Sequence, residues 1–305
     1  MADQVEVFIY TGGRVPEHLK QHITHVIIDL SVRSIDDFAF YECPNLVNVD
    51  VHDRVLKVGR EAFAHCPSLQ YVRMPGVKLV DDAAFFDCQK LMSAEFGSLE
   101  TIRFAAFSQC ISLRFFASKT VKNIGVAAFF CCEQLTDAEF GDALERVETR
   151  AFRRCFNLRR IAIPLKKFLL DCDVFNYCEN LVKVDFIGNV YKTMSFLSMY
   201  SWRNDIEEQI KWINRFLPTT SSNMKTVALQ QWIESILEKL KYYKTEHYKL
   251  LKEASTDLEL ALWKTKLENE RVQLWDKRQR EDCRFVCKSN IVIPSVISFL
   301  MIPEE

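Results

Sequence analysis

The cysteines are the residues of this sequence whose number and spacing most suggest chemistry. The chain has 305 residues and 11 cysteines, and a thiolate can act as a nucleophile or as a metal ligand. Cys283 and Cys287 are four residues apart on an expected helix and could form a redox pair or half of a metal site. Seven others recur every 22 or 23 residues: Cys43, Cys66, Cys88, Cys110, Cys132, Cys155 and Cys178.

These seven cysteines belong to a repeated phrase, A-F-x-x-C-x-x-L. Its copies are AFYECPNL at 39–46, AFAHCPSL at 62–69, AFFDCQKL at 84–91, AFSQCISL at 106–113, AFFCCEQL at 128–135, AFRRCFNL at 151–158 and the variant VFNYCENL at 174–181. Apolar residues stand three and usually five positions after each leucine, an alternation typical of a short strand with one buried face. One such unit cannot bury its own apolar face, so the period predicts a solenoid in which stacked units share a core.

The repeats resemble the BspA-type leucine-rich repeat family, in which A-F-x-x-C-x-x-L is the recurring phrase. The resemblance covers roughly residues 15–190. It implies an α+β architecture, a leucine-rich repeat solenoid with one short parallel strand per 22–23-residue coil. We expect this domain over residues 1–195, with an atypical N-terminal cap at 1–35 and the seven units over 39–190.

A helical domain is expected over residues 196–305. Apolar residues at helical spacing predict one helix from Trp202 to Leu217, which Pro218 stops. Similar spacing predicts a second helix over 227–250 and, after a restart at 255–257, a third toward Trp275. We expect a hairpin or bundle closed by the apolar stretch 291–302, which caps the solenoid, packs on itself or offers a groove to a partner helix. Many microalgal proteins are similar in joining such repeats to a Trp-rich helical tail, and that similarity implies the architecture without an activity.

The repeat predicts a structural role for its seven cysteines. Equivalent positions in a solenoid form a ladder whose rungs are about 4.8 Å apart with parallel side chains. Such a ladder does not converge on one point, as a tetrahedral metal site requires. The spacing alone would allow disulfides, but parallel side chains and a reducing compartment disfavour them. A free cysteine behaves as a small apolar residue in a tight core, and a thiol or metal-handling role, mainly through Cys283 and Cys287, remains the alternative.

A binding surface is expected on the strands. Residues two and four positions after each repeat leucine should point outward, and unlike the inward positions they vary freely. Tyr71, Arg73 and Phe115 stand out, because exposed aromatic and arginine side chains are enriched at binding hot spots. The candidate binding residues are Tyr71, Arg73, Glu95, Phe115, Asp137, Glu139, Arg160 and Lys183.

A cluster of basic residues suggests a second kind of ligand. The segment 146–167 is rich in arginine and lysine, and stacked on one edge these side chains would form a basic stripe able to hold a phosphate or an acidic peptide. The candidate stripe residues are Arg150, Arg153, Arg154, Arg159 and Arg160. Nucleic-acid or phosphoinositide binding through this stripe is therefore an alternative function.

The composition favours a binding protein over an enzyme. The net charge is −1, with 40 basic and 41 acidic residues, so nothing global draws the chain to nucleic acid or anionic membranes. The sequence contains no Gly-rich phosphate loop, no G-x-S-x-G and no H-E-x-x-H. We expect no cofactor and no membrane span. We also expect a cytoplasmic or nuclear location, because a secretory signal is lacking. The leading hypothesis is a non-enzymatic interaction module or scaffold that binds another protein on the strand face.

Overall fold

The computed structural model describes residues 6–188, 194, 195, 197 and 199–276. Its internal contacts divide the chain into two units. The first contains Met1–Tyr191 and Glu208–Leu237, and the second contains Lys192–Glu207 and Glu238–Glu305. The boundary expected at residues 195 and 196 marks where the repeat pattern stops, whereas the contacts group Glu208–Leu237 with the repeats.

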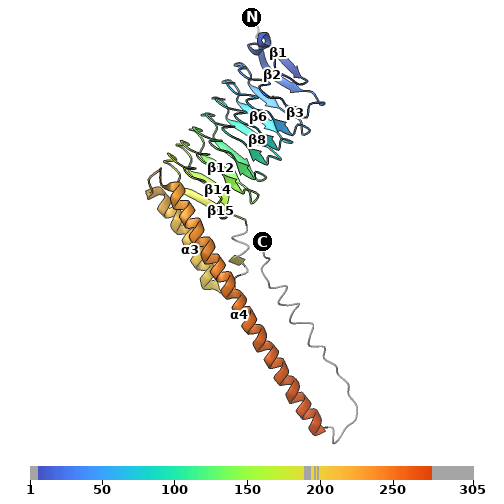
Figure 1. Ribbon diagram of the computed structural model, residues 1–305, viewed down its shortest axis with the longest axis vertical. Coiled ribbons are helices and arrows are strands. Elements are labelled where there is room, and N and C mark those ends of the chain that lie inside the picture. The colour runs from blue at the N-terminus through green and yellow to red at the C-terminus, as the bar shows by residue number, and fades with distance from the viewer. Residues whose placement is uncertain (1–5, 189–193, 196, 198, 277–305) are drawn as a thin grey trace. The chain divides into compact units, whose positions relative to one another are not determined.

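The first unit is a parallel-strand solenoid, as the repeat predicts (Figure 1). One long strand per coil follows each repeat leucine, and neighbouring strands pair in parallel. Together with β1 and β2 of the N-terminal end, these strands form two sheets. The first consists of β1 (Glu6–Tyr10), β2 (Ile23–Ile28), β4 (Asn48–Asp50), β6 (Tyr71–Met74) and β8 (Ser93–Phe96). The second consists of β10 (Phe115–Ser118), β12 (Asp137–Phe140), β14 (Arg160–Pro164) and β15 (Lys183–Ile187).

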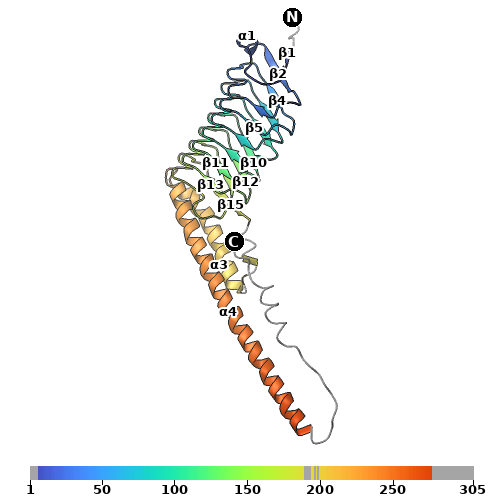
Figure 2. The same ribbon diagram turned by 45° about the vertical axis from the view of Figure 1, so that its right-hand side comes forward.

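Each inner coil also carries a second, two-residue strand, which the sequence pattern did not predict. These strands form a separate parallel sheet (Figure 2). They are β3 (Ser34–Ile35), β5 (Lys57–Val58), β7 (Leu79–Val80), β9 (Thr101–Ile102), β11 (Asn123–Ile124) and β13 (Arg146–Val147). The N-terminal end holds two further elements, β1, which pairs in parallel with β2, and the single-turn helix α1 (Glu17–Lys20). The sequence suggested only an atypical end unit in this region.

Two ladders of side chains lie in the core of the solenoid. The repeat phenylalanines are fully buried, and consecutive rings from Phe40 to Phe152 stack at centroid distances of 5.1–5.3 Å. The seven repeat cysteines are also buried. From the second rung on, each thiol donates a hydrogen bond to the carbonyl of the repeat phenylalanine in the preceding coil, as Cys66 does to Phe40 at 3.1 Å. The thiol is therefore more than an apolar filler, since it pairs a buried carbonyl.

The repeats are followed, within the described residues, by the helices α3 (Tyr200–Phe216) and α4 (Lys225–Asp276), joined through a short 3-10 turn at Leu217–Thr219. The expected stop at Pro218 is confirmed. The expected break at residues 255–257 is wrong, because α4 runs through it without interruption. Thr256 donates its hydroxyl to the Lys252 carbonyl inside the helix instead of capping a new one, and the stretch contains neither Gly nor Pro to end it.

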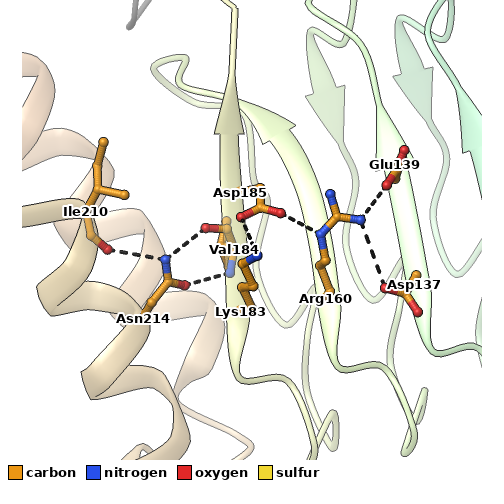
Figure 3. A network of polar contacts seen from close by, with 8 residues as sticks. All are labelled: Asp137, Glu139, Arg160, Lys183, Val184, Asp185, Ile210 and Asn214. Atoms are coloured by element: carbon orange, nitrogen blue, oxygen red, sulfur yellow. Dashed lines mark hydrogen bonds and ion pairs between the residues drawn. The ribbon is translucent and has the colours of Figure 1, made fainter. Parts of the chain in front are cut away.

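Residues of α3 and α4 that belong to the first unit cover the last coil. The side-chain amide of Asn214 pairs with both backbone groups of Val184 in β15 (Figure 3). Its Oδ1 accepts from the Val184 N–H at 2.7 Å, and its Nδ2 donates to the Val184 carbonyl at 3.1 Å. An amide side chain thus supplies the hydrogen bonds that a further strand would make, and it closes the open edge of the sheet.

The start of α4 closes the rest of the last coil in the same way. The Phe175 N–H donates to the Thr226 hydroxyl at 2.8 Å, whereas in the inner coils the equivalent amide donates to a carbonyl of the next coil. Lys225, only 1 % exposed, donates from Nζ to the Glu179 and Leu181 carbonyls at 2.8 and 2.7 Å. These contacts show that the start of α4 acts as a C-terminal cap of the solenoid.

The second unit holds the first turns of α3 and the later part of α4. Trp202 stacks on Tyr243 at 5.2 Å between ring centroids. The carboxylate of Asp205 accepts from the Tyr243 hydroxyl at 2.7 Å and pairs with Lys239 at 2.8 Å. No helix in the described part of the chain is long and apolar enough to cross a membrane. The apolar stretch 291–302 lies outside the described residues.

Candidate binding face of the solenoid

The outward side of the long strands forms a continuous face, called here the strand face. Each strand alternates buried and accessible residues, and parallel pairing in register aligns equivalent positions of successive coils. One outward row contains Asn48, Tyr71, Ser93, Phe115, Asp137, Arg160 and Lys183. All eight candidate binding residues lie on this face and are exposed or half-buried. Ala162, at an outward position of the pattern, is buried at 4 % exposure.

Arg160 is the centre of a polar network on this face (Figure 3). Its guanidinium donates to Glu139 on β12 and to Asp185 on β15, and it lies 4.0 Å from the Asp137 carboxylate. Lys183 pairs with Asp185 at 3.3 Å. The hydrogen bonds to Glu139 and Asp185 raise the pKa of Arg160 above its usual range. The positive charge of Arg160 is therefore already balanced by carboxylates of the same face.

Two of the three singled-out residues also have partners on this face. The Tyr71 hydroxyl donates to Glu95 at 2.9 Å, and Arg73 approaches Asp50 at 3.5 Å. The pKa of Tyr71 is raised mainly by partial burial and, to a smaller extent, by the hydrogen bond to Glu95. These contacts cross from one coil to the next, so they fix the side chains in place.

Phe115 is an aromatic residue of this face that is 49 % exposed. Asp137 pairs with it across the strands, and Ser93 holds the equivalent position in the preceding coil. Ala117, the next outward residue along β10, is also small. The aromatic ring therefore projects from a surrounding of small and charged residues, which is the arrangement of an anchor at a protein interface.

The five candidate stripe residues do not form a single stripe, which corrects the expectation from sequence. Arg160 lies on the strand face within its carboxylate network. Arg150, Arg153 and Arg154 lie instead on the turn that carries the A-F-x-x-C phrase, and they line a groove there. Arg159 is exposed and directly precedes β14. The physical reason is that one coil turns around the core, so residues close in sequence leave it on different sides.

The repeat cysteines are poor candidates for thiol chemistry. Burial raises the pKa of Cys43 to about 12 and holds those of Cys66, Cys88, Cys110, Cys132 and Cys155 well above the usual range. They are therefore protonated thiols, whereas nucleophiles and metal ligands need the thiolate. Within the described residues no group of three or more His, Cys, Asp or Glu side chains could hold a metal ion. Cys283 and Cys287 lie outside the described part of the chain.

Comparison with known families agrees with this geometry. A family profile described as a BspA type leucine rich repeat region matches six copies, over residues 18–117 and 100–201. The chain belongs to the BspA type leucine-rich repeat family. Membership in this family supports a protein-interaction module in general, because stacked leucine-rich repeats offer extended binding surfaces. Among curated proteins no sequence matches the chain.

Several solved leucine-rich repeat structures are similar to this chain. The leucine-rich repeat protein of T. pallidum is 27 % identical, over 55 % of this chain and 78 % of that one, with a TM-score of 0.46. A leucine rich cell surface protein from Faecalibacterium prausnitzii is 19 % identical, over 61 % and 69 % of the two chains, with a TM-score of 0.35. A leucine-rich repeat protein from Bacteroides ovatus is 17 % identical, over 61 % and 70 %, with a TM-score of 0.25.

Proposed function

We propose that this BspA type repeat protein is a non-enzymatic binding module or scaffold whose protein partner docks on the strand face. The observation that carries the proposal is Phe115, an aromatic residue that is 49 % exposed on a face where Tyr71, Arg73 and Arg160 are paired with carboxylates. A partner would cover this ring with an apolar residue and exchange ion pairs with the charged rows beside it.

The charge pattern of the face supports a protein partner over an anionic polymer. Carboxylates surround the strand-face arginines and lysine, as Glu139 and Asp185 do Arg160. A polyanion that bound here would have to break these ion pairs and would then lie against the acidic groups, so like-charge repulsion would oppose its binding. An intracellular location, cytoplasmic or nuclear, is part of the proposal, since a reducing compartment would keep the many cysteines of the sequence as free thiols.

The proposal can be tested by affinity capture with the full-length chain and single variants. Wild type, Phe115→Ser and Tyr71→Ser would be compared by quantitative mass spectrometry of the proteins they retain. Phe168→Ser is the matched control, since Phe168 is also an exposed phenylalanine, at 74 %, but lies between β14 and β15 in sequence, outside the strand face.

The expected result is a specific protein whose recovery falls at least fivefold with Phe115→Ser and is unchanged with Phe168→Ser. The assignment to the strand face would be overturned by a partner whose recovery falls equally with Phe115→Ser and Phe168→Ser, or falls with neither.

A further inference from the structure

A second surface of the solenoid lies along the turns that carry the A-F-x-x-C phrase, away from the strands. In every coil the residue before the Ala (or Val) and the residue before the Cys have positive φ, as Glu61 (49°) and His65 (58°) do. Because this conformation recurs, the accessible side chains of successive turns align in rows. We call this surface the turn edge.

Small residues make a trough in the middle of the turn edge. The position before the repeat Ala is alanine in three consecutive coils, at 83, 105 and 127, whereas the flanking coils carry Glu61 and Arg150 there. With no large side chain at these three positions, the turn edge sinks into a groove of about 670 Å³. The groove thus follows from the sequence of the turns.

Aromatic rings line the groove. Phe86 and Phe130 stand one position after the repeat Phe in alternate coils, with the small, buried Ser108 between them. Phe104, at the position preceding Ala105, is 55 % exposed beside them. The middle of the groove therefore offers accessible apolar surface, which favours an occupant with apolar side chains.

One end of the groove is strongly positive. Arg150, Arg153 and Arg154 line it, and within the described part of the chain no carboxylate lies at ion-pair distance from any of them. The buried Nε of Arg153 has no hydrogen-bond partner among the described residues. The guanidinium groups of Arg153 and Arg154 lie against the Tyr177 ring, at 5.4 and 5.9 Å, which holds them in place.

We infer that the turn-edge groove binds an extended acidic peptide segment of a partner protein. The groove crosses five coils, from Glu61 to Arg154, a span of roughly 19 Å at about 4.8 Å per step, which fits about six extended residues at 3.3 Å each. Apolar side chains would lie over the alanines and against the phenylalanines, and one or two carboxylates would pair with the three arginines. Arginine suits this role because its planar fork binds a carboxylate with two hydrogen bonds.

The polarity of the groove favours such a peptide over a polyphosphate or a lipid headgroup. Glu61, whose carboxylate pairs with Arg60, and His65 line the end opposite the arginines. A ligand that is anionic along its whole length would meet Glu61 and the apolar middle. A peptide with an acidic end and an apolar middle matches all three parts. This inference is independent of the strand face, since the two surfaces share no residue.

Fluorescein-labelled peptide probes test the inference on the full-length chain. The first probe has three apolar residues, Leu, Phe and Val, followed by Asp and Glu; a second has the reversed order, and a third replaces both acids with Lys. Binding is followed by fluorescence anisotropy at moderate salt. Ala127→Leu fills the trough, Phe104→Ser removes an exposed ring without touching the core, and Arg153→Gln with Arg154→Gln removes the positive end. Ala117→Leu and Arg160→Gln on the strand face are the matched controls, and circular dichroism checks folding.

We expect saturable binding of one acidic probe and at least tenfold weaker binding of the lysine probe. Phe104→Ser and the double arginine variant should each weaken binding at least tenfold, while the strand-face controls change it less than twofold. The inference is overturned if neither acidic probe saturates at 1 mM, or if binding survives both Phe104→Ser and Ala127→Leu. It is also overturned if inositol hexakisphosphate or phosphatidylserine vesicles bind through the arginines while the peptides do not.

Discussion

Replacing Asn214 by alanine should destabilise the C-terminal end of the solenoid. Val184 is fully buried, and both of its backbone groups are paired with the Asn214 amide. Asn214→Ala leaves a buried N–H and a buried carbonyl without partners, at roughly 1–3 kcal/mol each. Alanine has the higher helix propensity and returns about 0.5 kcal/mol. The expected net loss is therefore about 1.5–5.5 kcal/mol.

Two readouts follow this loss, namely urea unfolding of the full-length chain and amide hydrogen exchange. With a denaturant slope of about 3 kcal/mol per M, the urea midpoint should fall by roughly 1 M. Because a solenoid opens from its ends, exchange at the Val184 amide should accelerate before that of the inner strands. Arg215→Ala is the matched control on the same helix, since its side chain is 73 % exposed, and it should change stability by less than about 0.5 kcal/mol.

The reasoning about the cap is refuted if Asn214→Ala and Arg215→Ala unfold at the same urea concentration and exchange at Val184 is unchanged. That result would mean that water or a rearranged strand edge satisfies the backbone groups as well as the amide does.

Two further predictions concern the cap and the cysteine ladder. Lys225→Met removes both hydrogen bonds to the Glu179 and Leu181 carbonyls, but it also removes a buried charge, whose desolvation lowers the pKa of Lys225. We therefore expect a net loss of about 1–2 kcal/mol in the free energy of urea unfolding at neutral pH. An unchanged or higher urea midpoint would contradict this prediction. Burial raises the folded-state pKa of six ladder cysteines above the ordinary value of 9.0. The stability that these thiols contribute is therefore complete below pH 9 and is lost as the pH rises toward their folded-state pKa values. The loss can reach about 1.4 kcal/mol per thiol and pH unit. The urea midpoint in reducing buffer should therefore fall between pH 9 and 10 and fall less steeply in Cys66→Ala, whereas a midpoint independent of pH would contradict the burial of the thiols.

The repeat predicted the solenoid well because one physical constraint acts in every coil. Phe63, Cys66 and Leu69 recur in register since each must fill the same place in a shared core, and the structure buries all three. The hydrogen bond from the Cys66 thiol to the Phe40 carbonyl could not be predicted, because the sequence does not show whether a buried cysteine only fills space or also reaches an acceptor.

Several features that were missed depend on contacts between segments distant in the sequence, and one concerns a single helix. Gly76 is one example: a Cβ there would lie 1.8 Å from the Asp53 carbonyl oxygen of the preceding coil, so the close approach of two coils requires glycine. The strand β1 was missed because it lacks the repeat phrase and is recognised only by pairing with β2. The break near Ser255 was wrong because capping residues also occur inside helices, where their hydroxyls bond to the preceding turn.

The candidate surfaces were predictable to different degrees. Alternation within a strand placed Tyr71, Phe115 and Arg160 on one face, since side chains of a strand alternate strictly. The partners of Arg160 in neighbouring coils were not predictable, because their distance depends on rotamers. The groove of the turn edge was not predicted, although alanine at 83, 105 and 127 stands in the sequence close to Phe86 and Phe130. Its meaning required the backbone, which aligns these positions on one surface.

The most direct test of the central claim is photo-crosslinking from the strand face. A photoreactive benzoylphenylalanine would be introduced in place of Phe115 in the full-length chain, and in a parallel protein in place of Phe168. After irradiation with the source-cell extract, crosslinked proteins would be identified by mass spectrometry. The account predicts a specific protein crosslinked from position 115 and absent from position 168, and competed by unlabelled wild type but not by Phe115→Ser. A partner crosslinked equally from both positions, or only from position 168, would contradict the strand face as the binding surface.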